Sequence, residues 1–115
     1  MQEEGVSILA EKKGKVQVLQ LQGRLDAVTT PDTERKVLDI IDSGEYNLLL
    51  NFKQVEYISS AGMRMLLSAA KKAKSYSGKL ILSDINGPVL DVLKMSGFEH
   101  VLDLVKTEQD AIDKF

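Results

Sequence analysis

The chain has 115 residues, 43% of them apolar and 28% charged, and a formal net charge of -2, so we expect one globular domain spanning residues 1–115. The charge argues against nucleic acid as a partner, because nucleic-acid binders usually carry a basic face with aromatic side chains, and the absence of cysteine excludes disulfides and thiolate chemistry. No stretch approaches the roughly 20 apolar residues of a membrane span and the start Met1-Gln2-Glu3-Glu4 is acidic, so we expect a cytoplasmic protein without membrane insertion or a signal peptide.

The first half of the chain has the patterns typical of two strands, a helix and a third strand. Lys13-Gly14 is expected to form the hairpin turn between the first two strands, and Thr30 is expected to cap the helix. The third strand is a continuous apolar run, which is typical of a central strand covered on both faces. In chain order, we expect strands over residues 6–10 and 15–21, a loop over 23–27, a helix from Thr30 to Gly44, a strand over 46–52 and a further loop.

The second half alternates helices with strands. We expect a helix from Ser60 to Tyr76, a strand over 79–83, a helix opened by Asn86-Gly87-Pro88 and ended by Gly97, an edge strand over 101–105, and a last helix capped by Thr107. The predicted order is β-β-α-β-α-β-α-β-α. Strands alternating with helices indicate an α/β fold with a mixed, mostly parallel sheet of four or five strands and about four helices.

The segment Ser59-Ser60-Ala61-Gly62 is the most informative part of the sequence. It opens the central helix, where unpaired backbone N–H groups and the positive end of the helix dipole favour an anion such as a phosphate. Ser59 fits an N-cap that accepts a hydrogen bond from the N–H of Ala61 or Gly62. Gly62 is unfavourable within a helix. It either keeps the helix start open to another surface or packs tightly against a strand, and the local pattern leaves both readings open.

The apolar residues of this helix predict which of its faces is buried. At 100° per residue, we expect a core stripe formed by Met63, Leu66, Leu67, Ala70 and Ala73. Met65 then faces water one turn from the serines and is a candidate docking residue. Arg64 is expected on a solvated face.

No arrangement of residues typical of an enzyme is present. His100 is the sole histidine, so a nucleophilic serine has no evident base, and the G-x-S-x-G and Walker motifs are missing. We therefore expect no catalytic residue, no metal site and no cofactor.

Several spaced segments together resemble one known family. The run from Val55 to Leu66 is similar to the signature of STAS domains, specifically of anti-sigma factor antagonists. Gly23-x-Leu25-Asp26 resembles the first conserved loop of that family. The segments 92–98 and 108–111 resemble its late helix and its closing part, so that the similarity covers almost the whole chain.

This resemblance implies a regulatory switch. In the family, the unphosphorylated antagonist binds an anti-sigma factor that is itself a serine kinase and so frees a sigma factor. Phosphorylation of the serine at the helix start ends the binding, and a PP2C-type phosphatase restores it. The matching serine here is Ser60. The residues implied in partner binding are Asp26, Ser59, Ser60, Ala61, Gly62, Arg64 and Met65.

The chain departs from the family beside the phosphorylated position. Ser59 stands where an acidic residue is usual and Ala61 replaces the second serine of the pair, so Ser59 is a rival phosphorylation site. Asp26 fits equally a turn residue and a partner contact. The alternative function is a non-phosphorylated STAS subunit of a multiprotein complex, for example one that accompanies a lipid-transport ATPase.

Overall fold

The structure is a computed structural model that describes residues 5–115. After two initial strands, helices and strands alternate along the chain. The acidic segment Met1–Glu4 lies outside the described residues, so the expectation about the start of the chain is not addressed. In chain order the elements are β1 (Ser7–Lys13), β2 (Val16–Leu25), α1 (Thr30–Asp42), β3 (Asn47–Ile58), α2 (Ser60–Ser75), β4 (Lys79–Ser83), α3 (Gly87–Met95), a 3-10 turn η1 (Phe98–His100), β5 (Asp103–Val105) and α4 (Glu108–Asp113).

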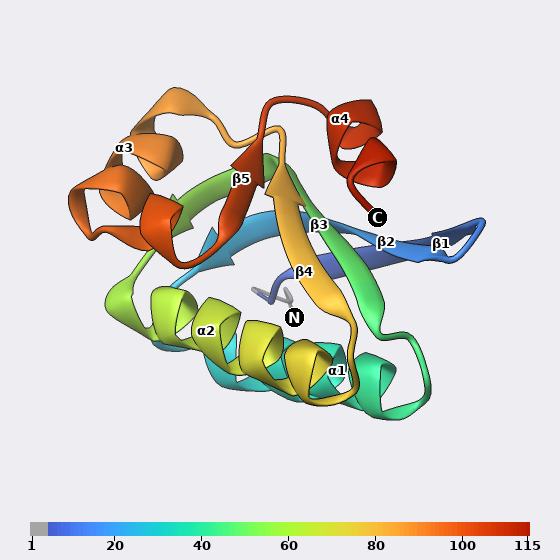
Figure 1. Ribbon diagram of the computed structural model, residues 1–115. Coiled ribbons are helices and arrows are strands. Elements are labelled where there is room, and N and C mark those ends of the chain that lie inside the picture. The colour runs from blue at the N-terminus through green and yellow to red at the C-terminus, as the bar shows by residue number, and fades with distance from the viewer. Residues whose placement is uncertain (1–4) are drawn as a thin grey trace.

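The five strands of this described part form one sheet in the order β1-β2-β3-β4-β5. β1 and β2 are antiparallel, and the other neighbours are parallel. Figure 1 shows α1 and α2 lying side by side along one face of the sheet, with α4 on the other. The predicted α/β class, the mixed, mostly parallel sheet and the element order are confirmed.

Strands β2 and β3 are longer than the sequence predicts. The loop expected over residues 23–27 is wrong in its first part, because β2 continues to Leu25, and β3 continues beyond Phe52 to Ile58. The register between these two strands shifts twice, with an extra β3 residue at each shift. Such bulges bend a strand and interrupt the alternation of buried and exposed residues, which is why the sequence pattern hides this part of β3. In Figure 1, β3 curves toward the start of α2.

The buried face of α2 differs from the predicted one. Met65 was expected to face water, but it is fully buried, and that prediction is wrong. Apolar residues lie on both sides of this helix, so a periodic pattern alone does not select the core face. The residues that α2 buries are Gly62, Met65, Leu66, Ala69 and Ala73.

The opposite face of the sheet carries a smaller hydrophobic cluster under α4. Thr107 caps α4 as predicted, since its Oγ1 accepts a 3.0 Å hydrogen bond from the Asp110 N–H. Ala111 is buried, and Ile112 and Phe115 pack beside it over β2, β3 and β4. The strand residues that they cover are Val16, Val18, Leu49 and Ile81.

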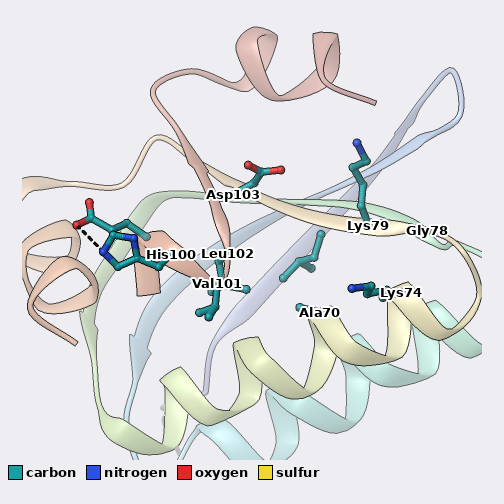
Figure 2. A pocket seen from close by; sticks show the side chains of 10 residues that line it. Ala70, Lys74, Gly78, Lys79, His100, Val101, Leu102 and Asp103 are labelled. Atoms are coloured by element: carbon teal, nitrogen blue, oxygen red, sulfur yellow. Dashed lines mark ion pairs between the residues drawn. The ribbon is translucent and has the colours of Figure 1, made fainter. Parts of the chain in front are cut away.

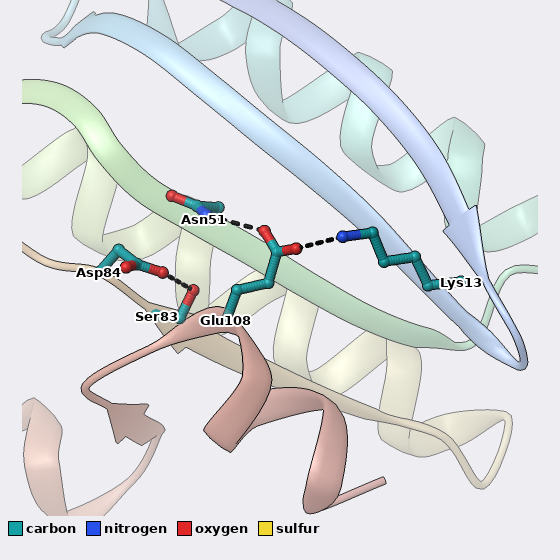
Figure 3. Close-up of polar contacts among 5 residues, drawn as sticks. All are labelled: Lys13, Asn51, Ser83, Asp84 and Glu108. Atoms are coloured by element: carbon teal, nitrogen blue, oxygen red, sulfur yellow. Dashed lines mark hydrogen bonds and ion pairs between the residues drawn. The ribbon is translucent and has the colours of Figure 1, made fainter.

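A polar bridge accompanies this cluster. The Glu108 carboxylate accepts hydrogen bonds from Asn51 Nδ2 at 2.9 Å and from Lys13 Nζ at 2.6 Å, so that α4 is tied to β3 and to the end of β1 (Figure 3). The Lys13 ammonium holds the pKa of Glu108 below its ordinary value, and Glu108 in turn raises the pKa of Lys13.

Candidate functional site

The start of α2 is bonded to the end of β2. Leu25, the last residue of β2, pairs with Ile58, the last residue of β3. The Ser59 N–H donates to the Leu25 carbonyl oxygen at 2.8 Å, and Ser59 Oγ donates to the same oxygen at 3.0 Å. Ser59 Oγ also accepts a 3.3 Å bond from the Gly62 N–H, which confirms Ser59 as the N-cap. The Ser59 hydroxyl is therefore engaged both as a donor and as an acceptor.

Gly62 faces the core. A Cβ atom on this residue would lie 2.8 Å from Ile58 Cγ1 and 3.1 Å from both Cβ and the carbonyl oxygen of Leu25. The tight-packing reading of Gly62 therefore holds, and the glycine does not serve to open the helix start to another molecule. The absence of a side chain on Gly62 lets α2 begin in close contact with the ends of β2 and β3.

Ser60 has a different environment from Ser59. Its side chain is exposed, and no protein group within residues 5–115 makes a hydrogen bond to its hydroxyl. Ala61 is half-buried and Arg64 is exposed, as expected for Arg64. The surface at the start of the 16-residue helix α2 thus presents Ser60 beside the positive end of the helix dipole. Met65 takes no part in this surface because it is buried.

Asp26 organises the loop between β2 and α1. Its Oδ1 accepts hydrogen bonds from the N–H groups of Val28 and Thr29, both at 3.0 Å. The bond from the Thr29 N–H is the main reason why the pKa of Asp26 lies below its ordinary value. The sequence left two roles open for Asp26. The role as a turn residue is confirmed, and contact with a partner stays a prediction.

The same loop corrects the predicted cap of α1. Thr29, not Thr30, occupies the N-cap position, and its side chain makes no cap hydrogen bond. Instead, Thr29 Oγ1 accepts from the Asp26 N–H at 3.1 Å and donates to the Arg24 carbonyl oxygen. Thr30 lies inside the first turn with a buried Oγ1 that has no hydrogen-bond partner among the described residues. The sequence analysis therefore placed the cap one residue too far along the chain, at Thr30 instead of Thr29.

Sequence reasoning missed two features beside this loop. Val28 is 84% exposed, and the guanidinium carbon of Arg24 lies 4.4 Å from the centroid of the Tyr57 ring. A shallow cleft is lined by Arg24, Asp26, Val28 and Glu56, among others. No sequence signal identified these residues, because Arg24 and Tyr57 pair only through the bulged register of β2 and β3.

A second groove lies at the other end of α2, where Lys74 and Ala70 face Lys79 and the segment from His100 to Asp103 (Figure 2). His100 is 79% exposed, and its Nε2 lies 3.8 Å from the Glu99 carboxylate. Neither Ser59 nor Ser60 lines this groove. Within residues 5–115 there is no group of three or more possible metal ligands and no helix long and apolar enough to cross a membrane.

Comparisons with known proteins agree with this architecture. The STAS domain family matches residues 7–111. BtrV of Bordetella bronchiseptica, named as a candidate anti-sigma factor antagonist, is 30% identical over 95 residues, which cover 83% of this chain and 82% of BtrV. The crystal structure of an anti-sigma factor antagonist from Mycobacterium paratuberculosis has a TM-score of 0.87 at 22% identity and covers 98% of this chain and 96% of its own.

A further solved neighbour is the Bacillus cell fate determinant SpoIIAA in its phosphorylated form. It has a TM-score of 0.71 at 22% identity, covering 94% of this chain and 98% of its own. At this identity the likeness establishes the fold. The match over residues 7–111, together with the relative at 30% identity, establishes that the chain belongs to the STAS domain family.

Proposed function

We propose that this chain is an anti-sigma factor antagonist that binds an anti-sigma factor serine kinase when unphosphorylated and is switched off by phosphorylation of Ser60. The names of its relatives support the first part, and the neighbour solved in a phosphorylated form supports the second. The observation that carries the choice of residue is the contrast between two adjacent serines. Ser59 uses its hydroxyl to join α2 to β2, whereas the Ser60 hydroxyl is exposed at the helix start.

This contrast favours Ser60 over its rival. A phosphate on Ser59 would remove the proton that Oγ donates to the Leu25 carbonyl and would place its charge beside that oxygen. A phosphate on Ser60 would extend from an exposed side chain near the positive end of α2, where the helix dipole stabilises it by about 0.3–1 kcal/mol. The fold can therefore accept the modification at Ser60 without rearrangement.

The proposed switch acts on the partner, not on the fold. A phosphate adds a charge of about -1.5 to -2 and considerable bulk to the surface formed by Ser60, Ala61 and Arg64. A kinase docked on this surface would have to bury that charge or move away from it, and both weaken the complex. A PP2C-type phosphatase would restore binding.

We propose further that the chain is not an enzyme. The ring of His100, the single histidine, lies near Glu99 and not in the bonding environment of either serine. A fluorophosphonate probe, which labels activated serines, should leave the folded protein unlabelled. Labelling of Ser60 would contradict the proposal.

The modification is tested with purified protein, the cognate anti-sigma kinase and ATP, followed by mass spectrometry of the peptides. We expect one phosphate on Ser60 in the natural protein and in Ser59→Ala, and none in Ser60→Ala. Phosphate on Ser59, or no phosphate on either serine, would overturn the switch.

Binding tests the electrostatic mechanism separately. Ser60→Asp should weaken the complex with the kinase by at least about tenfold, because a charge at the docking surface is left opposed or unpaired. Ser7→Asp, an equivalent change at an exposed serine in β1, should leave the affinity unchanged. Purification of the natural protein with membrane ATPase subunits instead of a kinase would favour the alternative of a non-phosphorylated STAS subunit.

A further inference from the structure

The loop between β2 and α1 presents an apolar side chain to solvent. Val28 is 84% exposed, while valine is normally buried in a folded domain. A single exposed valine on a surface is usually without consequence. This one requires explanation because of how its backbone is held and what surrounds it.

Val28 is held in place by hydrogen bonds on both sides. Its own N–H and that of Thr29 both donate to Asp26 Oδ1 at 3.0 Å. The Thr30 N–H donates to the Asp26 carbonyl oxygen at 3.0 Å, so that the loop leads directly into α1. Since the loop is already ordered, a partner that packs on Val28 loses little conformational entropy in fixing it.

The neighbours of Val28 give the surface a definite chemistry. Arg24 lines the same cleft, and its guanidinium lies over the Tyr57 ring. Arginine and tyrosine are enriched at the centres of protein interfaces, and here this pair lies in the same region of the surface as the exposed Val28. The surface fits a partner with an apolar pocket for Val28 and a carboxylate that faces Arg24.

Hydrogen bonds between Leu25 and Ser59 join the end of β2, where this loop begins, to the start of α2. The carbonyl oxygen of Leu25 receives both hydrogen bonds from Ser59, and the loop begins at the next residue, Asp26. Ser60 follows Ser59 directly. The cleft beside Val28 and the surface around Ser60 therefore both lie at the joined ends of β2 and β3, and one partner can cover both.

We propose that Val28 is the apolar anchor by which the anti-sigma factor kinase docks, and that Asp26 is a positioning residue that holds Val28, not itself a contact. This inference rests on the proposed function. It also accounts for the direction of the switch, because a partner carboxylate chosen to face Arg24 is repelled by a phosphate on Ser60.

The anchor is tested by Val28→Thr, which keeps the shape of the side chain and adds a hydroxyl that must be desolvated in the complex. We expect the affinity for the kinase, measured by calorimetry, to fall by about tenfold or more. Val101→Thr is the matched control, since Val101 is 63% exposed and lies outside the docking surface, and it should bind as the natural protein does. Equal affinity of Val28→Thr and the natural protein would overturn the inference.

The role of Asp26 is tested by two substitutions. Asp26→Asn keeps an oxygen that can accept from the Val28 and Thr29 N–H groups, so a positioning role predicts binding within about threefold of the natural protein. Asp26→Ala removes that acceptor and should weaken binding about as much as Val28→Thr does. If Asp26→Asn loses affinity as severely as Asp26→Ala, the carboxylate charge contacts the partner directly and the positioning role is wrong.

The partner chemistry is tested by Arg24→Gln. Removing the cation should weaken the complex and make its affinity less sensitive to added salt. An unchanged dependence on salt would contradict a carboxylate facing Arg24. Failure of the natural protein to bind any anti-sigma kinase would instead refute the proposed function, so the two failures are distinguishable.

Discussion

The two faces of the sheet are stabilised in different ways. The face covered by α1, α2 and α3 carries a large apolar core. Two glycines at the ends of α2 leave no room for a side chain there: Gly62 lies against Leu25 and Ile58, and Gly78 lies against the backbone of Tyr46. On the face covered by α4, a small cluster is joined by a polar bridge centred on Glu108. On the first face, the Ser59 bonds and the close contacts of Gly62 join the start of α2, and with it Ser60, to the end of β2. The stability of the second face depends in part on the charges of Glu108 and Lys13.

The largest effect is expected at Gly78, just after α2. A Cβ atom there would lie 2.0 Å from the carbonyl oxygen of Tyr46, and the backbone has to move to accept it. We expect Gly78→Ala to lower the free energy of unfolding by about 3 kcal/mol or more, as overpacking against a rigid backbone does. Denaturant unfolding measures the change. Gly87→Ala is the control, because nothing lies within 4 Å of its added Cβ, and a comparable loss there would refute the steric reason.

A smaller loss is expected at Gly62. Its added Cβ would meet a side-chain atom of Ile58 at 2.8 Å, and it would meet Leu25 at 3.1 Å. Overpacking costs about 1–3 kcal/mol, while replacing glycine by alanine in a helix returns up to about 1 kcal/mol. Gly62→Ala should therefore lower the free energy of unfolding by about 1–2 kcal/mol. A gain in stability would mean that the start of α2 moves freely, against the close contacts described above.

The next effect separates the two serines. Ser59→Ala removes the cap bond to the Gly62 N–H and the bond to the Leu25 carbonyl oxygen, and it should cost about 1 kcal/mol of unfolding free energy. Ser60→Ala should change stability by less than about 0.5 kcal/mol, since its hydroxyl is exposed. Thermal unfolding of both variants measures the difference. If Ser60→Ala proved the more destabilising change, the assignment of cap and acceptor would be reversed.

Much of this architecture was predictable because the relevant signals are local. The order of elements, the cap at Ser59 and the strand from Lys79 to Ser83 follow from residues close together in the chain. The end of β3 could not be predicted from local sequence, because its bulges depend on the register with β2. Met65 was placed wrongly because α2 is apolar on two sides, and the close fit of Gly62 on Leu25 and Ile58 decides which side is buried.

The candidate site shows the same division. The two serines and Asp26 were identified from the sequence, but which serine is bonded and what Asp26 holds depend on contacts between the end of β2 and α2 or within the loop. Val28 has no sequence signal, since exposure of an apolar side chain is a property of the folded loop. Thus the two serines, the cap at Ser59 and the turn reading of Asp26 were accessible to sequence reasoning, whereas the bond of Ser59 to Leu25 and the exposure of Val28 were not.

The smallest effect is expected on the α4 face, as a dependence on pH. The pKa of Glu108 is lowered in the folded protein by its hydrogen bond with Lys13, so the charged carboxylate stabilises the fold at pH values above its unfolded pKa of about 4.3. This stabilisation is lost as the pH falls through the lowered folded pKa. Glu108→Gln should therefore be less stable than the natural protein at pH 7, and the gap should narrow as the pH is lowered below 4.

The control for this last change is Asp32→Asn, which removes a carboxylate of lowered pKa from the exposed surface of α1, where ion pairs contribute little. Unfolding in urea between pH 3 and pH 7 compares both variants with the natural protein. Glu108 joins α4 to β3 and β1, so its loss should also increase hydrogen exchange in α4 while leaving α2 unchanged. Equal increases in α2 and α4 would mean that the two faces unfold as one unit, and the contrast between them would not hold.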